Sequence, residues 1–110
     1  MSSLEDTLAA QLRLAGIPFS REYKAIIGRK FHWDFMVPST KGGWLIECQG
    51  AVWVKGAHST GTGITRDAVK NNLANLAGYH VLLVTADHIK SGQALRWIQQ
   101  ALEVGWVGRG

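Results

Sequence analysis

The chain has 110 residues, 46% of them hydrophobic and 18% charged, which fits one packed domain over 1–110 and excludes an extended disordered protein. Its net charge of +4 and its five Trp residues favour a nucleic acid as partner. The single cysteine, Cys48, excludes an intramolecular disulfide. No apolar run reaches about 18 residues, and the first residues are acidic, so we expect no membrane span, no signal peptide and a cytoplasmic location.

A helix is expected first, because Ser2 or Ser3 can cap it, Glu5 and Asp6 suit the positive end of its dipole, and Gly16 ends it. Its apolar stripe consists of Leu4, Leu8 and Leu12. Three strands are expected next, with a tight turn at Gly28-Arg29-Lys30 between the first two. Their predicted ranges are 20–27, 31–37 and 44–49.

The second half begins with segment 50–63, which contains four Gly and is long enough to indicate a functional loop. A helix over 64–77 follows, with a predicted apolar stripe of Val69, Leu73, Leu76 and Ala77 and with Asp67, Lys70, Asn71 and Ala74 on the adjoining face. The apolar run 79–85 indicates a central strand covered on both faces. Ser91 can cap a last helix to about Val104.

This order of elements predicts an α/β fold in which helices flank a mixed sheet. The first three strands form a meander, and a helical crossover leads to the fourth.

Two acidic residues interrupt predicted strands that are otherwise mostly apolar. Asp34 lies in the second strand and Glu47 in the third, where Gln49 shares its face because side chains alternate. A buried carboxylate costs free energy unless something pairs with it. Carboxylates on neighbouring strands, together with the carbonyl of Cys48, are the hard oxygen ligands that suit Mg²⁺ or Mn²⁺. The pattern therefore predicts a divalent-metal site.

The sequence also resembles a known group of enzymes. Helix-Glu5, strand-Asp34, strand-Glu47-x-Gln49 and a helix with Asp67-x-x-Lys70 resemble the PD-(D/E)XK nuclease superfamily from Glu5 to about Thr85. The resemblance implies an αβββαβ restriction-endonuclease-like core, here with an additional C-terminal helix. The single-domain form is similar to archaeal-type Holliday-junction resolvases, virus-type replication-repair nucleases and very-short-patch-repair-like endonucleases. The segments 47–50, 58–63 and 66–71 also look like small phage and prophage members.

The resemblance implies a role for each matching residue. Asp34 and Glu47 match the metal-binding acids, and Glu5 matches an accessory acid of resolvase-like members, although Glu5 also suits the first turn of any helix. The sequence departs from the commonest pattern at Gln49, where a catalytic Lys usually stands, and it lacks the Pro before Asp34. Lys70 is a candidate for the missing cation, as migrated lysines are in related proteins.

A metal-dependent DNA endonuclease follows from this resemblance, with duplex or branched DNA as substrate and a homodimer as the working form. His58 is a further catalytic candidate, as a proton carrier or phosphate contact. The residues expected to hold the DNA are Arg29, Lys30, Lys55, His58 and Arg66. The alternatives are a DNA-binding module with a nuclease fold that cuts poorly or not at all, which Gln49 favours, and a metal-independent protein-interaction domain.

Ordinary structural roles stay open for the same residues. Asp34 could pair with Arg29 or Lys30, and Lys70 could be a solvated lysine beside Asp67. A zinc site is not expected, because Cys48, His58, His80 and His88 fit no compact zinc pattern. The glycine-rich loop lacks the Gly-Lys-Ser/Thr of a nucleotide-binding loop.

Overall fold

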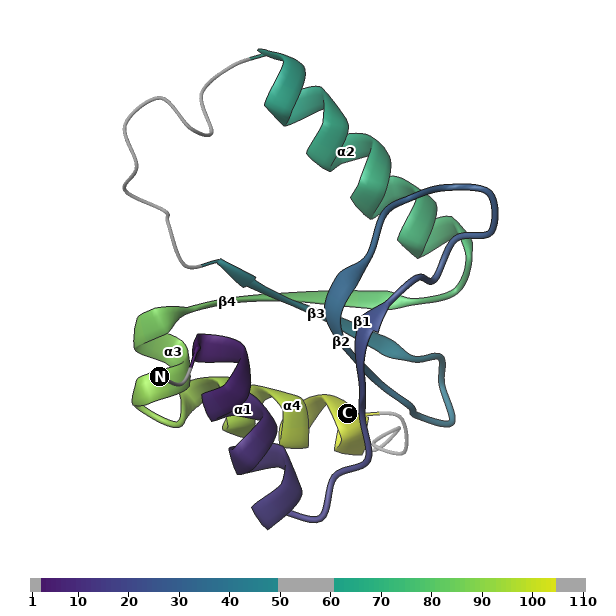
Figure 1. Ribbon diagram of the computed structural model, residues 1–110. Helices are drawn as coiled ribbons and strands as arrows, with labels where there is room; N and C mark the ends of the chain where they lie inside the picture. The colour runs from purple at the N-terminus through teal and green to yellow at the C-terminus, as the bar shows by residue number, and fades with distance from the viewer. Residues whose placement is uncertain (1–2, 50–60, 105–110) are drawn as a thin grey trace.

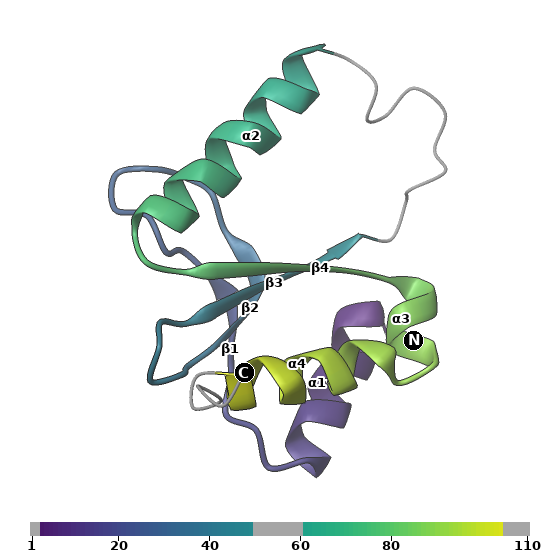
Figure 2. The same cartoon turned by 180° about the vertical axis from the view of Figure 1, so that it is seen from behind.

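The computed structural model describes residues 3–49 and 61–104. A mixed four-stranded sheet has one long helix on one face and three helices on the other (Figures 1 and 2). The elements are α1 (Leu4–Leu14), β1 (Ser20–Tyr23), β2 (Trp33–Val37), β3 (Trp44–Gln49), α2 (Gly61–Leu76), β4 (His80–Thr85), α3 (Ala86–Lys90) and α4 (Gln93–Val104). The predicted α/β fold and the order of its elements are confirmed.

The sheet has the strand order β1-β2-β3-β4. The first three strands are antiparallel neighbours, with Arg21 opposite Phe35 and Phe35 opposite Ile46. β4 runs parallel to β3, which it can do because α2 carries the chain back across the sheet. The predicted meander and helical crossover are therefore present.

Each face of the sheet has its own apolar core. Beneath the sheet, α1, α3 and α4 cover the larger core, which includes Leu8, Phe35, Ile46, Val84 and Ile98. Above it, Trp33, Leu45 and Ala74 form a smaller core, and Tyr23, Ala25, Ile26, Phe31, Met36, Tyr79 and Val81 pack around it. Of the α2 residues whose burial is described, only those in the second half contribute to this core, and residues 64–68 are exposed. In the described parts of the chain, no helix has the length and apolarity needed to cross a bilayer.

Two predictions about the strands are wrong for identifiable reasons, and one helix was not predicted. β1 ends at Tyr23 rather than 27, after Glu22 adopts a left-handed conformation with φ 50°. β4 lies at the edge of the sheet rather than in its centre, so Leu83 is 46% exposed. The last helix, α4, begins after Ser91 and ends at Val104 as predicted, and Ser91 Oγ accepts from the N–H of Gln93 at 3.3 Å. The short helix α3 before it was not predicted, and Thr85 caps it together with His88.

Two turns come into contact at the end of the sheet where β3 and β4 begin. A Cβ atom on Gly42, which precedes β3, would overlap with the carbonyl oxygen of Gly78, which precedes β4. The N–H of His80 donates to the carbonyl oxygen of Gly43 at 3.0 Å. Gly42 also has a φ of 102°, which favours glycine. These contacts join the β2–β3 hairpin to the α2–β4 segment.

Candidate functional site

Asp34 occupies the point where β2 leaves β3. The register of the two strands runs from Val37 opposite Trp44 to Phe35 opposite Ile46, and Asp34 lies one residue beyond it. Its Oδ2 accepts a hydrogen bond of 2.7 Å from the backbone N–H of Cys48. The carboxylate thus supplies an acceptor to β3 where the strand ladder stops. This contact replaces the predicted alternative of an ion pair with Arg29 or Lys30.

Glu47 forms an ion pair that joins the sheet to α2. The Nζ of Lys70 lies 3.2 Å from Oε2 of Glu47, and the two side chains are 17% and 31% exposed respectively. The other oxygen, Oε1, is buried and has no hydrogen-bond partner among the residues that the structure describes. A buried carboxylate oxygen without a partner is costly, so this atom is a candidate to accept from a donor or cation that the described residues do not supply.

Burial raises the pKa of both carboxyls above their ordinary values. For Asp34 the main cause is desolvation, which the hydrogen bond from Cys48 partly offsets, and the charges of Glu5 and Glu22 raise the pKa further. For Glu47 desolvation again dominates, Lys70 lowers the pKa and Asp34 raises it. Two carboxyls that resist ionisation in one place indicate a site that a cation would stabilise.

Lys70 rests on an aromatic ring that the sequence-based interpretation did not assign to the site. Its Nζ lies 4.9 Å from the ring centre of Trp33, in the range of a cation–π contact. The helix face that carries Lys70 and Ala74 packs on the sheet, whereas Leu76, predicted to be apolar and buried, is 84% exposed. The predicted stripe was therefore rotated, because Ala74 packs against Trp33 and Leu45. The signal that could have pointed to Trp33 as a site residue was its position directly before Asp34 in the sequence.

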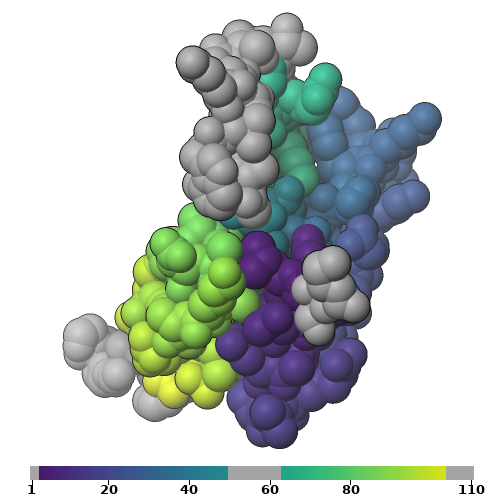
Figure 3. Space-filling view, turned by 60° about the vertical axis from the view of Figure 1, so that its left-hand side comes forward, coloured from purple at the N-terminus to yellow at the C-terminus, as the bar shows by residue number. Residues whose placement is uncertain are grey.

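Glu5 approaches the site from the first turn of α1. Its charge raises the pKa of Asp34 in addition to the larger effect of burial, so the two carboxylates are electrostatic neighbours. In the space-filling view the start of α1, in dark purple, adjoins the blue and teal residues of the strands (Figure 3). Within residues 3–49 and 61–104, however, no three His, Cys, Asp or Glu side chains are close enough to hold one metal ion.

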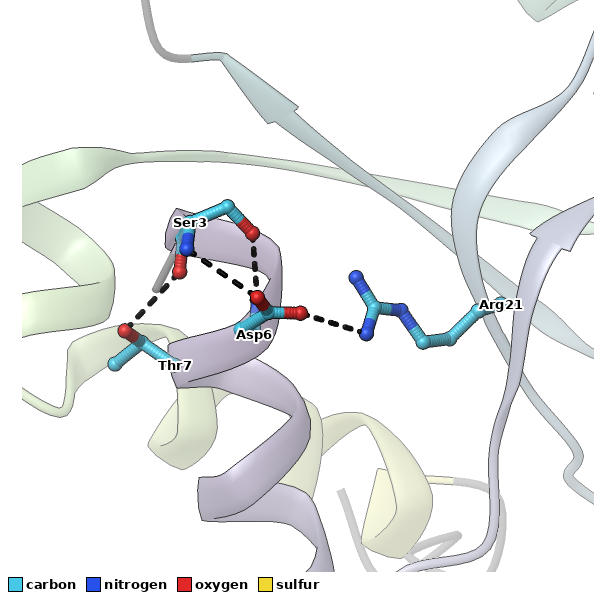
Figure 4. A network of polar contacts seen from close by, with 4 residues as sticks. All are labelled: Ser3, Asp6, Thr7 and Arg21. Atoms are coloured by element: carbon cyan, nitrogen blue, oxygen red, sulfur yellow. Dashed lines mark hydrogen bonds and ion pairs between the residues drawn. The ribbon is translucent and has the colours of Figure 1, made fainter. Parts of the chain in front are cut away.

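A polar network fixes the start of α1 (Figure 4). Ser3 Oγ accepts from the N–H of Asp6 at 3.1 Å, and Thr7 Oγ1 donates to the Ser3 carbonyl at 3.2 Å. Arg21 of β1 donates to Asp6 Oδ1 at 2.9 Å and is the main reason why the pKa of Asp6 lies below its ordinary value. An exposed ion pair contributes little to stability, so we assign the network mainly to orientation of the turn that carries Glu5.

The next two residues of β3 have different surroundings. The thiol of Cys48 has its pKa raised to about 12, first by burial and then by the neighbouring acids, so it stays protonated in the metal-free protein. Gln49 lies opposite Thr85 at the end of β3. Among the described residues it makes no hydrogen bond to Asp34, Glu47 or Lys70.

The predicted DNA-binding residues are divided between two places. Arg29 and Lys30 are exposed in the β1–β2 loop, and Arg66 is exposed near the start of α2. Lys55 and His58 lie outside the residues that the structure describes. The structure thus brings together Asp34, Glu47, Lys70 and the Cys48 backbone, with Glu5 nearby.

Comparison with known proteins identifies the fold. No protein-family model matches the sequence, and no curated protein does. Among solved structures, the chain is similar to one titled "Homing Endonuclease I-Bth0305I Catalytic Domain", with a TM-score of 0.66 over 96% of this chain and 97% of that chain. The two sequences are 18% identical, which makes the likeness one of fold. The chain therefore has the fold of a homing endonuclease catalytic domain over nearly its whole length.

Proposed function

We propose that this protein is a divalent-metal-dependent DNA endonuclease of the PD-(D/E)XK type. The observation that carries the proposal is the buried, unpartnered Oε1 of Glu47, next to an Oε2 held by Lys70 and close enough to Asp34 for their charges to interact. The endonuclease fold and the net charge of +4 support DNA as the substrate.

The donor set fits Mg²⁺ or Mn²⁺. Mg²⁺ takes one or two carboxylates and completes its shell with water and phosphate oxygens, so a cluster of three acids is not required. Oδ1 of Asp34 and Oε1 of Glu47 would hold the ion, and Glu5 would act through a water molecule. The Cys48 carbonyl leaves β3 on the same side as the N–H that Asp34 accepts, so it is also directed to this place.

Each remaining residue has a defined task in phosphodiester hydrolysis. A bound divalent ion supplies Lewis-acid stabilisation and a more acidic water. Lys70, held between Glu47 and the ring of Trp33, balances the negative charge that develops at the cleaved phosphate. Gln49, two residues after Glu47, positions water, and His58 contacts the phosphate.

Purified protein incubated with plasmid, a four-way junction and a flap, in Mg²⁺, Mn²⁺ or EDTA, tests the proposal. We expect metal-dependent cleavage by the wild type, with a preference for branched DNA cut by a homodimer, and no cleavage by Glu47→Gln. Glu103→Gln changes an exposed acid on α4 and is the matched control. Full metal-dependent activity of Glu47→Gln would remove Glu47 from the site.

A second function has one observation in its favour. Gln49 stands where the resembling nucleases usually carry a catalytic Lys, which is the pattern of a nuclease fold that binds DNA without cutting it. In the same experiment such a module would shift all three DNAs in a gel and leave them intact in every metal. A protein that neither binds nor cuts would exclude both functions.

A further inference from the structure

The loop between β1 and β2 carries the most exposed large apolar residue of the described chain. Ile27 is 100% exposed. The N–H of Arg29 donates to the carbonyl oxygen of Ile26 at 3.3 Å, and Gly28 has a φ of 83°. These features define a type II turn with Ile27 at its first central position. The backbone of the turn therefore directs Ile27 outward.

The loop is anchored on both sides of this tip. Ile26 and Phe31 pack against the small core of Trp33, Leu45 and Ala74. The guanidinium of Arg29 lies 5.6 Å from the ring centre of Phe31. An anchored turn presents Ile27 as a fixed apolar projection, which costs less conformational entropy on binding than a free loop would.

Positive charge surrounds the tip. Between Tyr23 and Trp33 the chain has three cationic side chains and no acid. All three, Lys24, Arg29 and Lys30, are exposed. The acid that directly precedes this segment in the sequence, Glu22, contacts His32, whose Nδ1 lies 3.0 Å from Oε1 of Glu22. The tip therefore combines one exposed aliphatic side chain with three cations that form no ion pair with any described residue.

We propose that Ile27 is a DNA wedge, which enters between stacked base pairs while Lys24, Arg29 and Lys30 hold the flanking phosphates. Proteins that kink DNA insert aliphatic side chains in this way, and the cations supply the salt-dependent part of the binding. The loop packs on Trp33, the residue whose ring also supports Lys70, so wedge and proposed site share one side of the sheet. The inference rests on the proposed nuclease function and adds how the DNA is deformed.

The test uses short duplexes with 2-aminopurine at successive positions, mixed with the full chain in EDTA so that binding is measured without cleavage. The wild type should increase the fluorescence of an unstacked base. Ile27→Ser should abolish this increase and weaken binding roughly tenfold or more, from loss of the apolar contact. Ile27→Leu should restore both. Leu14→Ser, at a 91% exposed leucine on α1, is the matched control and should behave as the wild type.

The outcomes separate this inference from the proposed function. A wild type that binds and cuts DNA, with Ile27→Ser equal to it in fluorescence and affinity, would overturn the wedge and leave the nuclease in place. A dimer that Ile27→Ser converts to monomer in sedimentation, with unchanged 2-aminopurine signal, would assign the tip to self-association instead. Absence of any DNA binding by the wild type would overturn the nuclease proposal and the wedge together.

Discussion

Asp34 has two roles that two substitutions can separate. Its Oδ2 accepts the N–H of Cys48 at 2.7 Å, and its charge is the part that a metal would need. Asp34→Ala removes both, whereas Asp34→Asn keeps an amide oxygen for the N–H and removes only the charge. Leaving a partly buried N–H without an acceptor costs about 1–3 kcal/mol. In a domain of this size that lowers Tm by roughly 5–15 °C.

Asp34→Asn should instead be at least as stable as the wild type near neutral pH. Burial raises the pKa of Asp34, so the folded protein disfavours the charged form that the substitution removes. Both variants should lose metal-dependent cleavage. Thermal unfolding in EDTA and cleavage of plasmid in Mg²⁺ measure the two effects, and Asp87→Asn, an exposed acid on α3, is the control.

Two results would refute this reasoning. Equal Tm values for Asp34→Ala and Asp34→Asn would show that the hydrogen bond to Cys48 does not stabilise the fold. Full cleavage by Asp34→Asn would show that the charge is not a metal ligand.

The other predictions concern the surroundings of Asp34. Lys70→Met should lower the cleavage rate about a hundredfold. It should also raise the pKa of Glu47 further, because Lys70 lowers that pKa in the wild type. An unchanged cleavage rate, with metal binding intact by calorimetry, would leave Lys70 a structural residue. Because the pKa of Asp34 is raised in the folded protein, the metal-free protein loses stability as pH rises through that pKa. In urea unfolding, the difference in unfolding free energy between Asp34→Asn and the wild type should therefore widen from about pH 4 toward neutrality. A difference that stays constant with pH would contradict this. Cys48 should resist thiol reagents in the folded protein, since its pKa is about 12. Cys48→Ser should also retain cleavage, because the proposed site uses only the backbone of this residue, and loss of activity would show that its side chain is needed.

The sequence was sufficient for the fold because its local signals agree. Ser3 and Asp6 form the capping box of α1, and the third strand occupies the predicted 44–49. The alternation around Asp34 and Glu47 also placed both acids on neighbouring strands, as observed. These features depend on residues close together in the chain, which is why they could be predicted.

The remaining features depend on contacts between distant segments. The face of α2 that meets the sheet carries Lys70 and not Leu76, because Ala74 packs against Trp33 and Leu45. The spacing of apolar residues along the helix does not reveal this contact. The edge position of β4 follows from which strand it pairs with, and an apolar run does not show this. The unpartnered Oε1 of Glu47 likewise becomes visible only when all its neighbours are placed.

The contact between the turns at Gly42 and Gly78 has a consequence far from where it occurs. The hairpin that begins β3 carries the two acids, and the crossover that ends before β4 carries Lys70. Gly42 thus acts as a spacer, and its missing side chain sets how closely the two halves approach. A single added methyl group would push them apart at the opposite end of β3 from Glu47. A random screen for inactive variants should therefore find substitutions at Gly42 as well as at Asp34 and Glu47, although Gly42 contacts neither acid.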